Sequence, residues 1–152
     1  MTGNNDDGGN GIFLKYGGTL NAVNATITIN KVGFNAVYVK SGTINASSST
    51  INLTGGCNYG LRVNGGTATI GELNIDGAKA HSAVRAQGSS VVTINGGTIK
   101  NSVQNGVNVL NTASLTMKNV TVSKSGQKDI VREHNTATIN LTNVTYSTGY
   151  GK

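Results

Sequence analysis

A short apolar phrase returns along this chain at an almost constant interval. Its clearest copy lies in residues 138–146, where four apolar side chains alternate with Thr and Asn. The last apolar position of the phrase recurs every 23 or 24 residues, at Ile27, Ile51, Ile75, Ile99, Val122 and Tyr146. Self-similarity at a fixed period is the signature of a repeat architecture, so this feature limits the possible folds more than any other.

Two further apolar series keep the same period. The first comprises Leu20, Ile44, Ala68, Val92, Leu115 and Ile139, and the second comprises Val37, Leu61, Val84, Val107 and Ile130. Each coil of 23–24 residues therefore contains three short strands in which apolar and polar residues alternate. One such coil cannot bury its own apolar face, whereas stacked coils bury continuous inner ridges of equivalent side chains.

These patterns predict an all-β fold, namely a single-stranded parallel β-helix (a solenoid) of about six coils of 23–24 residues with three parallel sheets. The composition agrees, because the chain is rich in Val, Ile and Thr and has no Pro to interrupt strand pairing. We expect one domain over residues 12–152, preceded by a flexible lead-in at residues 1–11. Both ends look unsealed, which indicates a piece of a longer rod.

The repeat has irregular positions that carry expectations of their own. Arg132 occupies a slot held elsewhere by Val or Ala, and a charge cannot point into a dry core, so the strand there should end or bulge. Gly97 lies in a column of variable size, which predicts a narrow core nearby. Asn10, Asn35 and Asn105 could stack in a partial ladder, although turn chemistry is the simpler interpretation.

The register also predicts a candidate binding surface. Tyr38, Arg62 and Arg85 share one outward slot of the third strand, and Lys15 and Lys40 share the outward slot two residues further on. Stacked coils would hold Arg62 and Arg85 about 5 Å apart, so an anion or water should lie between the two cations. We interpret these five residues as a stripe that binds sulfated glycan or an acidic receptor patch. Ordinary solvated arginines are the plainer alternative.

The charge balance allows acidic partners and disfavours nucleic acid. There are 12 Lys and Arg against 6 Asp and Glu, a net charge of +6, which favours polyanions or acidic cell surfaces but is also typical of a solubilising surface. A second basic group comprises Lys118, Lys124, Lys128 and Arg132. The aromatic stacking platform expected of a single-strand binding protein is missing, so we expect no nucleic acid partner.

Catalytic and metal sites are not predicted. A polysaccharide-cleaving β-helix enzyme needs clustered carboxylates, and the acids here do not converge: Asp6, Asp7, Glu72, Asp76, Asp129 and Glu133. His81 and His134 lie in turns of different coils without partners at zinc spacing. Cys57 stands alone, so there is no internal disulfide. We therefore expect no enzymatic activity, cofactor or metal ion, and keep the polysaccharide-cleaving enzyme as an alternative.

Runs such as GTLNA at residues 18–22, GTINA at 42–46 and TINL at 138–141 make the chain resemble a known family. It is similar to the right-handed parallel β-helix passenger domains of bacterial autotransporters, the type V secretion family. The likeness lies in repeat style, composition and scarcity of Cys. It implies a right-handed coil, export through the outer membrane of a Gram-negative bacterium, and secretion or display at the cell surface.

The resemblance also implies a function. Many such passengers are adhesins, which predicts an extracellular, non-enzymatic module that presents a host-binding surface to a cell-surface receptor or an acidic glycan. The alternatives are a secreted ligand that activates a host receptor, such as an angiogenic one, the polysaccharide-cleaving enzyme, and a structural spacer. We expect a monomer without a transmembrane segment, because no apolar stretch is long enough, and an export signal that is missing from this sequence.

Overall fold

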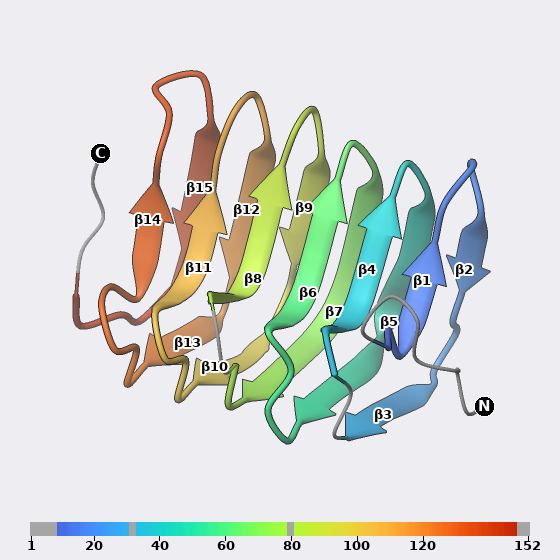
Figure 1. The fold of residues 1–152 in the computed structure, drawn as a ribbon, viewed down its shortest axis with the longest axis horizontal. Coiled ribbons are helices and arrows are strands. Elements are labelled where there is room, and N and C mark those ends of the chain that lie inside the picture. The colour runs from blue at the N-terminus through green and yellow to red at the C-terminus, as the bar shows by residue number, and fades with distance from the viewer. Residues whose placement is uncertain (1–8, 31–32, 79–80, 149–152) are drawn as a thin grey trace.

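The computed structural model describes residues 9–30, 33–78 and 81–148, and these form a parallel β-solenoid without a helix (Figure 1). The front wall in Figure 1 is a six-stranded sheet of β1 (Ile12–Leu14), β4 (Asn35–Lys40), β6 (Tyr59–Asn64), β8 (Ser82–Gln87), β11 (Asn105–Val109) and β14 (Ile130–Arg132). Each front strand begins a coil, so the coils are numbered one to six from β1 to β14. The predicted all-β solenoid is confirmed, with five complete turns between the first and last front strands.

The chain leaves each front strand at the top, descends the back wall and returns along the floor (Figure 1). The back wall consists of β2 (Thr19–Asn21), the first half of β5 (Thr43–Thr54), the first half of β7 (Thr67–Asp76), β9 (Val91–Ile94), β12 (Ser114–Lys118) and β15 (Thr138–Thr142). The floor consists of β3 (Thr26–Asn30), the second halves of β5 and β7, β10 (Gly97–Lys100) and β13 (Val120–Ser123). Figure 1 shows that this path is right-handed, as is usual for parallel strands joined by crossovers.

Hydrogen bonding joins the back wall and the floor into one sheet. β5 and β7 continue around the corner between the two walls, so the three predicted walls form a six-stranded sheet and a nine-stranded sheet. All strand pairs of the described residues are parallel. The described part of the chain contains no helix that could cross a membrane.

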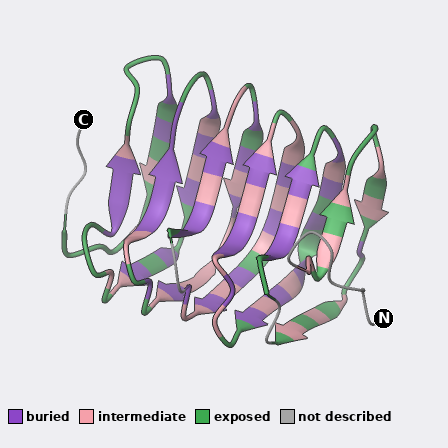
Figure 2. Cartoon of the chain, in the orientation of Figure 1, coloured by how far each residue is buried: buried purple, intermediate pink, exposed green. Residues whose placement is uncertain are grey.

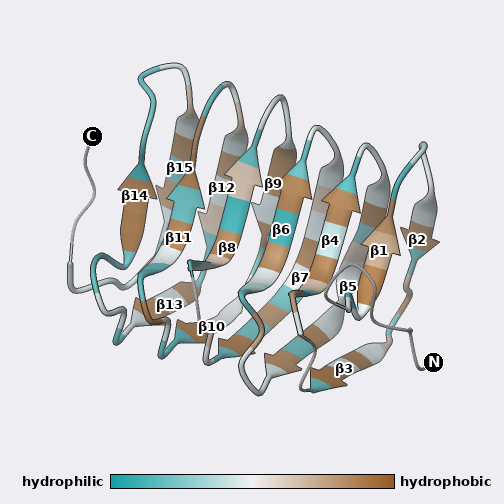
Figure 3. Ribbon diagram, in the orientation of Figure 1, coloured by the Kyte–Doolittle hydropathy of each residue, from teal (hydrophilic) through white to brown (hydrophobic). Residues whose placement is uncertain are grey.

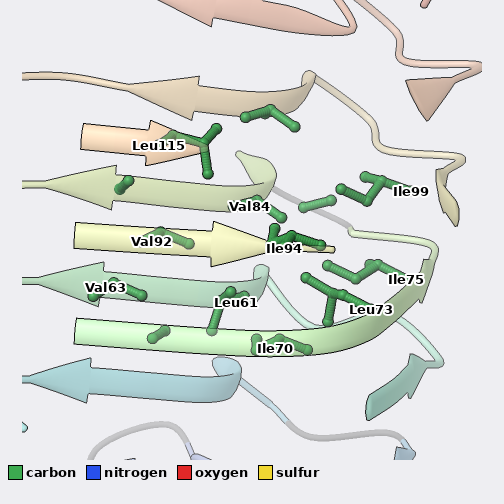
Figure 4. Packing of buried hydrophobic residues seen from close by; sticks show 14 of the residues in the cluster. Leu61, Val63, Ile70, Leu73, Ile75, Val84, Val92, Ile94, Ile99 and Leu115 are labelled. Carbon is green, nitrogen blue, oxygen red and sulfur yellow. The ribbon is translucent and has the colours of Figure 1, made fainter. Parts of the chain in front are cut away.

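Inward side chains stack into the ridges that the repeat predicts. Successive register partners on the back wall are Leu20, Ile44, Ala68, Val92, Leu115 and Ile139. Those on the front wall are Ile12, Val37, Leu61, Val84, Val107 and Ile130. Most of these side chains are buried (Figure 2), and Figure 4 shows several of them in the space between the walls. Full burial of such a side chain contributes about 1.5–3 kcal/mol, so these ridges dominate the stability.

The predicted floor column is wrong at one step, between coils two and three. The 24-residue spacing places Ile51 on Ile75, but the structure pairs Ile51 with Leu73. Leu53 is the register partner of Ile75 instead. The predicted pairings of Ile27 with Ile51, of Ile75 with Ile99 and of Ile99 with Val122 are confirmed. The floor strands of coils one and two are therefore displaced together by two residues relative to those that follow.

The displacement arises at the corner between the back wall and the floor. Coil two has three residues at this corner, Ser47–Ser49, where coil three has only Gly71. Pairing between the two coils ends at Ala46 with Ile70 and resumes at Thr50 with Glu72. Coil two thus spends two more residues on the corner. An even number of extra residues keeps the alternation of inward and outward side chains, so the core stays apolar although the partners change.

The extra corner residues are held by the same corner of coil one. Ser48 Oγ accepts a hydrogen bond from Asn24 N–H at 3.1 Å, and Ser49 Oγ accepts one from Ala25 N–H at 3.0 Å. Ser49 is buried, and its hydroxyl donates to Ala22 O at 3.0 Å. These contacts satisfy the polar groups of a corner that carries no sheet pairing of its own.

One of the irregular positions, Arg132, behaves as predicted, and Gly97 shows a different constraint from the narrow core expected there. The backbone of the neighbouring coil comes very close to Gly97, whose φ is +116° and whose Cβ, if present, would lie 2.2 Å from Leu73 O. Only glycine fits this approach between coils, and the narrow core stays a prediction. β14 ends at Arg132, which still pairs with Val109 and is half-buried in the last front strand.

The Asn side chains stack more than turn chemistry alone would require. Asn35 is buried, and its Nδ2 donates to Asn10 Oδ1 at 2.6 Å, which forms the first rung of the suggested ladder. The next partner of Asn35 is Tyr59, so the ladder does not reach Asn105. Similar amide rungs join Asn21 to Asn45 and Asn119 to Asn143. Most of the predicted lead-in, residues 1–8, lies outside the described residues. Within the rest of it, Gly11 N–H donates a hydrogen bond to Asn35 O at 3.1 Å.

Candidate functional site

The parallel register brings Tyr38, Arg62 and Arg85 into one outward column of the front wall, as predicted. Arg62 is the register partner of both Tyr38 and Arg85. Each of these residues lies between two buried apolar neighbours, so strand alternation directs it outward. Figure 3 shows the result as a hydrophilic band across the middle of β6 and β8, which continues onto β11. The column continues to Phe13 on one side and to Asn108 on the other.

Tyr38 is enclosed by its neighbours along the column. The ring of Phe13 stacks on it, with ring centroids 5.1 Å apart and planes inclined by 6°. Arg62 Cζ lies 5.0 Å from the Tyr38 centroid. Because Phe13 and Arg62 belong to the coils before and after Tyr38, they cover opposite faces of its ring. Such ring pairs and cation–π contacts contribute about 0.5–1.5 kcal/mol each, enough to order these side chains in the free protein.

Tyr59 lies at the centre of this face, and the sequence analysis missed it. The residue is 6% exposed, and its ring centroid lies 5.1 Å from Arg62 Cζ and 5.9 Å from Arg85 Cζ. His81 stacks on the ring with 5.2 Å between centroids, and Phe34 meets its edge at 6.4 Å. An aromatic ring thus accompanies both guanidinium groups, and the anion or water expected between them stays a prediction.

A change of alternation at the corner turns Tyr59 outward. Gly60 and Leu61 both face the core: a Cβ on Gly60 would lie 2.7 Å from Ile75 Cδ1, and Leu61 is fully buried. Two consecutive inward residues reverse the alternation before them, so Tyr59 shares the outer face with Arg62, three residues later. A signal for this cluster does exist in the sequence, because ring side chains stand at or just before the start of three consecutive front strands: Phe34, Tyr59 and His81.

The two arginines are held before any ligand arrives. Arg85 Nε donates to Gln87 Oε1 at 2.7 Å within the same strand. Arg62 Nε is shielded from solvent and has no hydrogen-bond partner among the described residues, because the side chain packs against two rings. The planar guanidinium fork matches the oxygens of carboxylates and similar oxyanions. We refer to Tyr38, Tyr59, Arg62 and Arg85 as the arginine–tyrosine array.

The two predicted lysines flank this array. Lys15 Nζ lies 5.4 Å from the Phe13 centroid and 4.8 Å from the Tyr16 centroid. Lys40 is exposed at the end of β4. The one ion pair found within residues 9–30, 33–78 and 81–148 lies on the floor. None of the four predicted cations is therefore neutralised by a described carboxylate, which leaves the face available to an external anion.

The outward column of the array meets a carboxylate toward the last coil. Asn108, the next residue of the column, is buried, and its Nδ2 donates to Glu133 Oε1 at 2.6 Å. Glu133 is exposed and follows Arg132, the last residue of β14. A carboxylate at this end repels an anion that approaches from the array. Within this outward column, the arginines are thus confined to coils three and four.

Two shallow hollows lie on the floor rather than on the front wall. The first measures about 350 Å³ and is lined mainly by Asn52, Thr54, Asn74, Asp76, Thr98 and Lys100. The second measures about 370 Å³ and adjoins the first at Asp76. Asn101 Nδ2 donates to Asp76 Oδ1 at 2.6 Å and Lys100 Nζ lies 3.2 Å from Asp76 Oδ2, so both neighbours lower the pKa of this carboxyl group. No second described carboxylate lines either hollow to form an acid–base pair.

Asp129 is the buried carboxylate of the described chain, and it closes the last coil. Its Oδ2 accepts hydrogen bonds from Ser147 N–H and Ser147 Oγ–H, each at 2.8 Å, and from Thr148 N–H at 3.1 Å. Its Oδ1 accepts from Ser125 N–H at 3.4 Å. Burial by itself raises the pKa of Asp129, but these hydrogen bonds outweigh it and hold the pKa below its usual value. We interpret Asp129 as a structural clasp.

The remaining reactive side chains are dispersed. His134 Nδ1 accepts a hydrogen bond from Asn111 N–H at 3.0 Å. Cys57 is buried, and burial raises the pKa of its thiol. In the part of the chain that the structure describes, no three His, Cys, Asp or Glu side chains gather where they could hold a metal ion.

No family model, curated protein or solved structure matches this chain.

Proposed function

We propose that this chain is a non-enzymatic binding module which attaches to an acidic patch on a host-cell surface through the arginine–tyrosine array. The module is extracellular, as expected of a passenger domain exported by a bacterial autotransporter. The parallel solenoid is compatible with such a domain. The acidic partner is a receptor patch or a glycan, and the array with Lys15 and Lys40 is the contact surface.

One observation carries the proposal: two arginines are fixed against aromatic rings without a carboxylate partner. Arg62 lies within 5.1 Å of two tyrosine rings, and Arg85 is bonded to Gln87. An isolated surface arginine loses rotamer freedom when it binds, whereas an arginine that is already ordered loses less, so more of its interaction energy is available for affinity. An ordinary solvated arginine, the plainer alternative, lacks such ring contacts.

A cell-attachment assay tests the proposal. Fluorescently labelled protein is incubated with cultured animal cells, and the bound fraction is compared between the wild type and the double variant Arg62→Ala plus Arg85→Ala. Each charge-assisted contact contributes about 1.5 kcal/mol or more, so the double variant should bind roughly 100-fold more weakly or worse. The matched control is Lys118→Ala plus Lys128→Ala, which removes the same charge from exposed positions outside the array.

The outcomes separate the alternatives. Attachment that depends on the array but not on the control lysines supports the proposal. Equal losses in the two double variants would indicate general charge attraction instead, and undiminished attachment of the array variant would exclude this surface. Receptor phosphorylation in cells treated with soluble protein would identify a receptor ligand rather than an adhesin. Thermal melts of the control variant should match the wild type, whereas the array variant should melt slightly lower because it loses its ring contacts.

A further inference from the structure

Cations on the front wall are arranged one to a coil. Lys15 belongs to coil one, Lys40 to coil two, Arg62 to coil three and Arg85 to coil four. Parallel strands of neighbouring coils lie about 4.8 Å apart, so the positive charges succeed one another along the solenoid axis with roughly this repeat. The arginines lie in one column and the lysines in the column two residues further along the strand. The row ends at coil five, where Asn108 follows Arg85 in register and is bonded to Glu133.

The faces of the best-placed ring in this row are already occupied. Phe13 and Arg62 cover the two faces of Tyr38. A sugar or a nucleotide base therefore cannot stack on Tyr38, although stacking is the usual way in which aromatic residues hold such ligands. What the row offers to a ligand is guanidinium N–H groups, ammonium groups and the edges of rings. This chemistry selects a ligand by its anions rather than by its apolar faces.

From these observations, and resting on the proposed function, we infer that the ligand is a linear glycan with an anionic group on every sugar residue, bound along the solenoid axis. A sugar residue of an extended glycan is about as long as one coil is high, so successive sugars meet successive coils. A densely sulfated glycan places an anion opposite each cation. A glycan with a carboxylate on alternate sugars leaves every second cation unpaired. The contact covers about four sugars, one for each cationic coil.

Tyr59 is the residue that positions the arginines for this ligand. It is the described ring that contacts both guanidinium groups, and its own burial against His81 and Phe34 fixes its orientation. It carries no charge itself, so its contribution can be separated from that of the cations. Loss of the ring leaves the number of positive charges unchanged and removes their alignment.

Binding of two glycans over a range of salt concentrations tests the inference. Heparin oligosaccharides carry anions on every sugar, and hyaluronan oligosaccharides of equal length carry them on alternate sugars. We expect heparin to bind at least tenfold more tightly, with affinity that rises up to a length of about four sugars and then levels off. Counterion release makes the logarithm of affinity fall with the logarithm of salt concentration, and each lost contact reduces that slope by roughly 0.7–0.9, the range known for nucleic acids.

Substitutions separate the contribution of the positive charges to heparin binding from the contribution of Tyr59, which positions them. Arg62→Ala and Arg85→Ala should each weaken heparin binding and reduce the salt slope. Tyr59→Leu should weaken binding roughly 5- to 30-fold, from two lost cation–π contacts, with an unchanged slope. Tyr59→Phe keeps the ring and should bind like the wild type. Tyr146→Leu, which removes a partly exposed tyrosine from the last coil, is the matched control and should have no effect.

The results distinguish a failure of this inference from a failure of the proposed function. Equal affinity for heparin and hyaluronan, or heparin binding that ignores Arg62 and Arg85, overturns the inference. Attachment to cells through the array without heparin binding also overturns it, and then points to an acidic protein receptor. A Tyr59→Leu variant that binds like the wild type refutes the positioning role alone. Attachment to cells that ignores the array refutes the proposed function itself.

Discussion

Replacing Gly97 with Ala should destabilise the solenoid far more than the same change at another glycine with positive φ. Gly97 has φ +116°, outside the left-handed region that other residues enter, and its Cβ would lie 2.2 Å from Leu73 O. Gly65 provides the matched control, because its φ is +72° and a Cβ there would meet nothing within 4 Å. The two substitutions add the same atom and differ in the backbone conformation and in what the new atom meets.

The expected magnitudes follow from these two environments. Gly65→Ala should cost about 1–2 kcal/mol, the ordinary penalty for a left-handed residue. Gly97→Ala should cost roughly 4 kcal/mol, about 3 from a backbone conformation that only glycine tolerates and about 1 from a weakened ladder hydrogen bond as the strands move apart. For a chain of this size, 1 kcal/mol lowers Tm by about 2–4 °C, so the two variants should differ clearly.

Urea denaturation measures the difference. With an m-value of about 2 kcal/mol/M, the midpoint should fall by about 2 M for Gly97→Ala and by less than about 1 M for Gly65→Ala. Hydrogen exchange should accelerate in β7, β10 and β13, which meet at Gly97, and remain unchanged in β1 and β2. Equal midpoint shifts in the two variants would contradict the close approach of Gly97 to Leu73, and so would exchange that accelerates evenly in every coil.

Two further predictions concern the ends and the corners of the solenoid. The lowered pKa of Asp129 means that its contribution to stability is present above the usual carboxyl pKa of about 4 and is lost as pH falls through the lower folded value, so Asp129→Asn should flatten the acid limb of stability against pH. Hydrogen exchange at residues 145–148 should also rise in that variant; an unchanged acid limb would rule out the clasp. Deleting two of the three residues Ser47–Ser49 should preserve folding, because the inward and outward faces are kept, whereas deleting one should unfold the floor of coil two. Circular dichroism melts compare the two deletions, and similar Tm values for both would refute this account of the corner.

The front wall could be predicted from the sequence because its strands carry no extra residues between repeats. Consecutive residues alternate in direction, and the 23–24-residue period then assigns every partner, including Tyr38, Arg62 and Arg85. The same rule could not place Tyr59. Gly60 points inward beside Leu61, and this local reversal depends on contact with Ile75 from the floor, which no spacing along the chain reveals.

The floor shows a second limit of the same kind. Alternation reports which face a residue occupies, but a shift of two residues leaves every face unchanged. The pairing of Ile51 with Leu73 instead of Ile75 was therefore invisible in the pattern. It was decided by how Ser48 and Ser49 fit against the corner of coil one.

The sequence by itself determined that this chain folds as a stack of parallel coils and which side chains face the interior, because period and alternation are local properties of the repeat. Only the tertiary structure decided how many residues each corner consumes and which ring accompanies the arginines, because both depend on packing between coils.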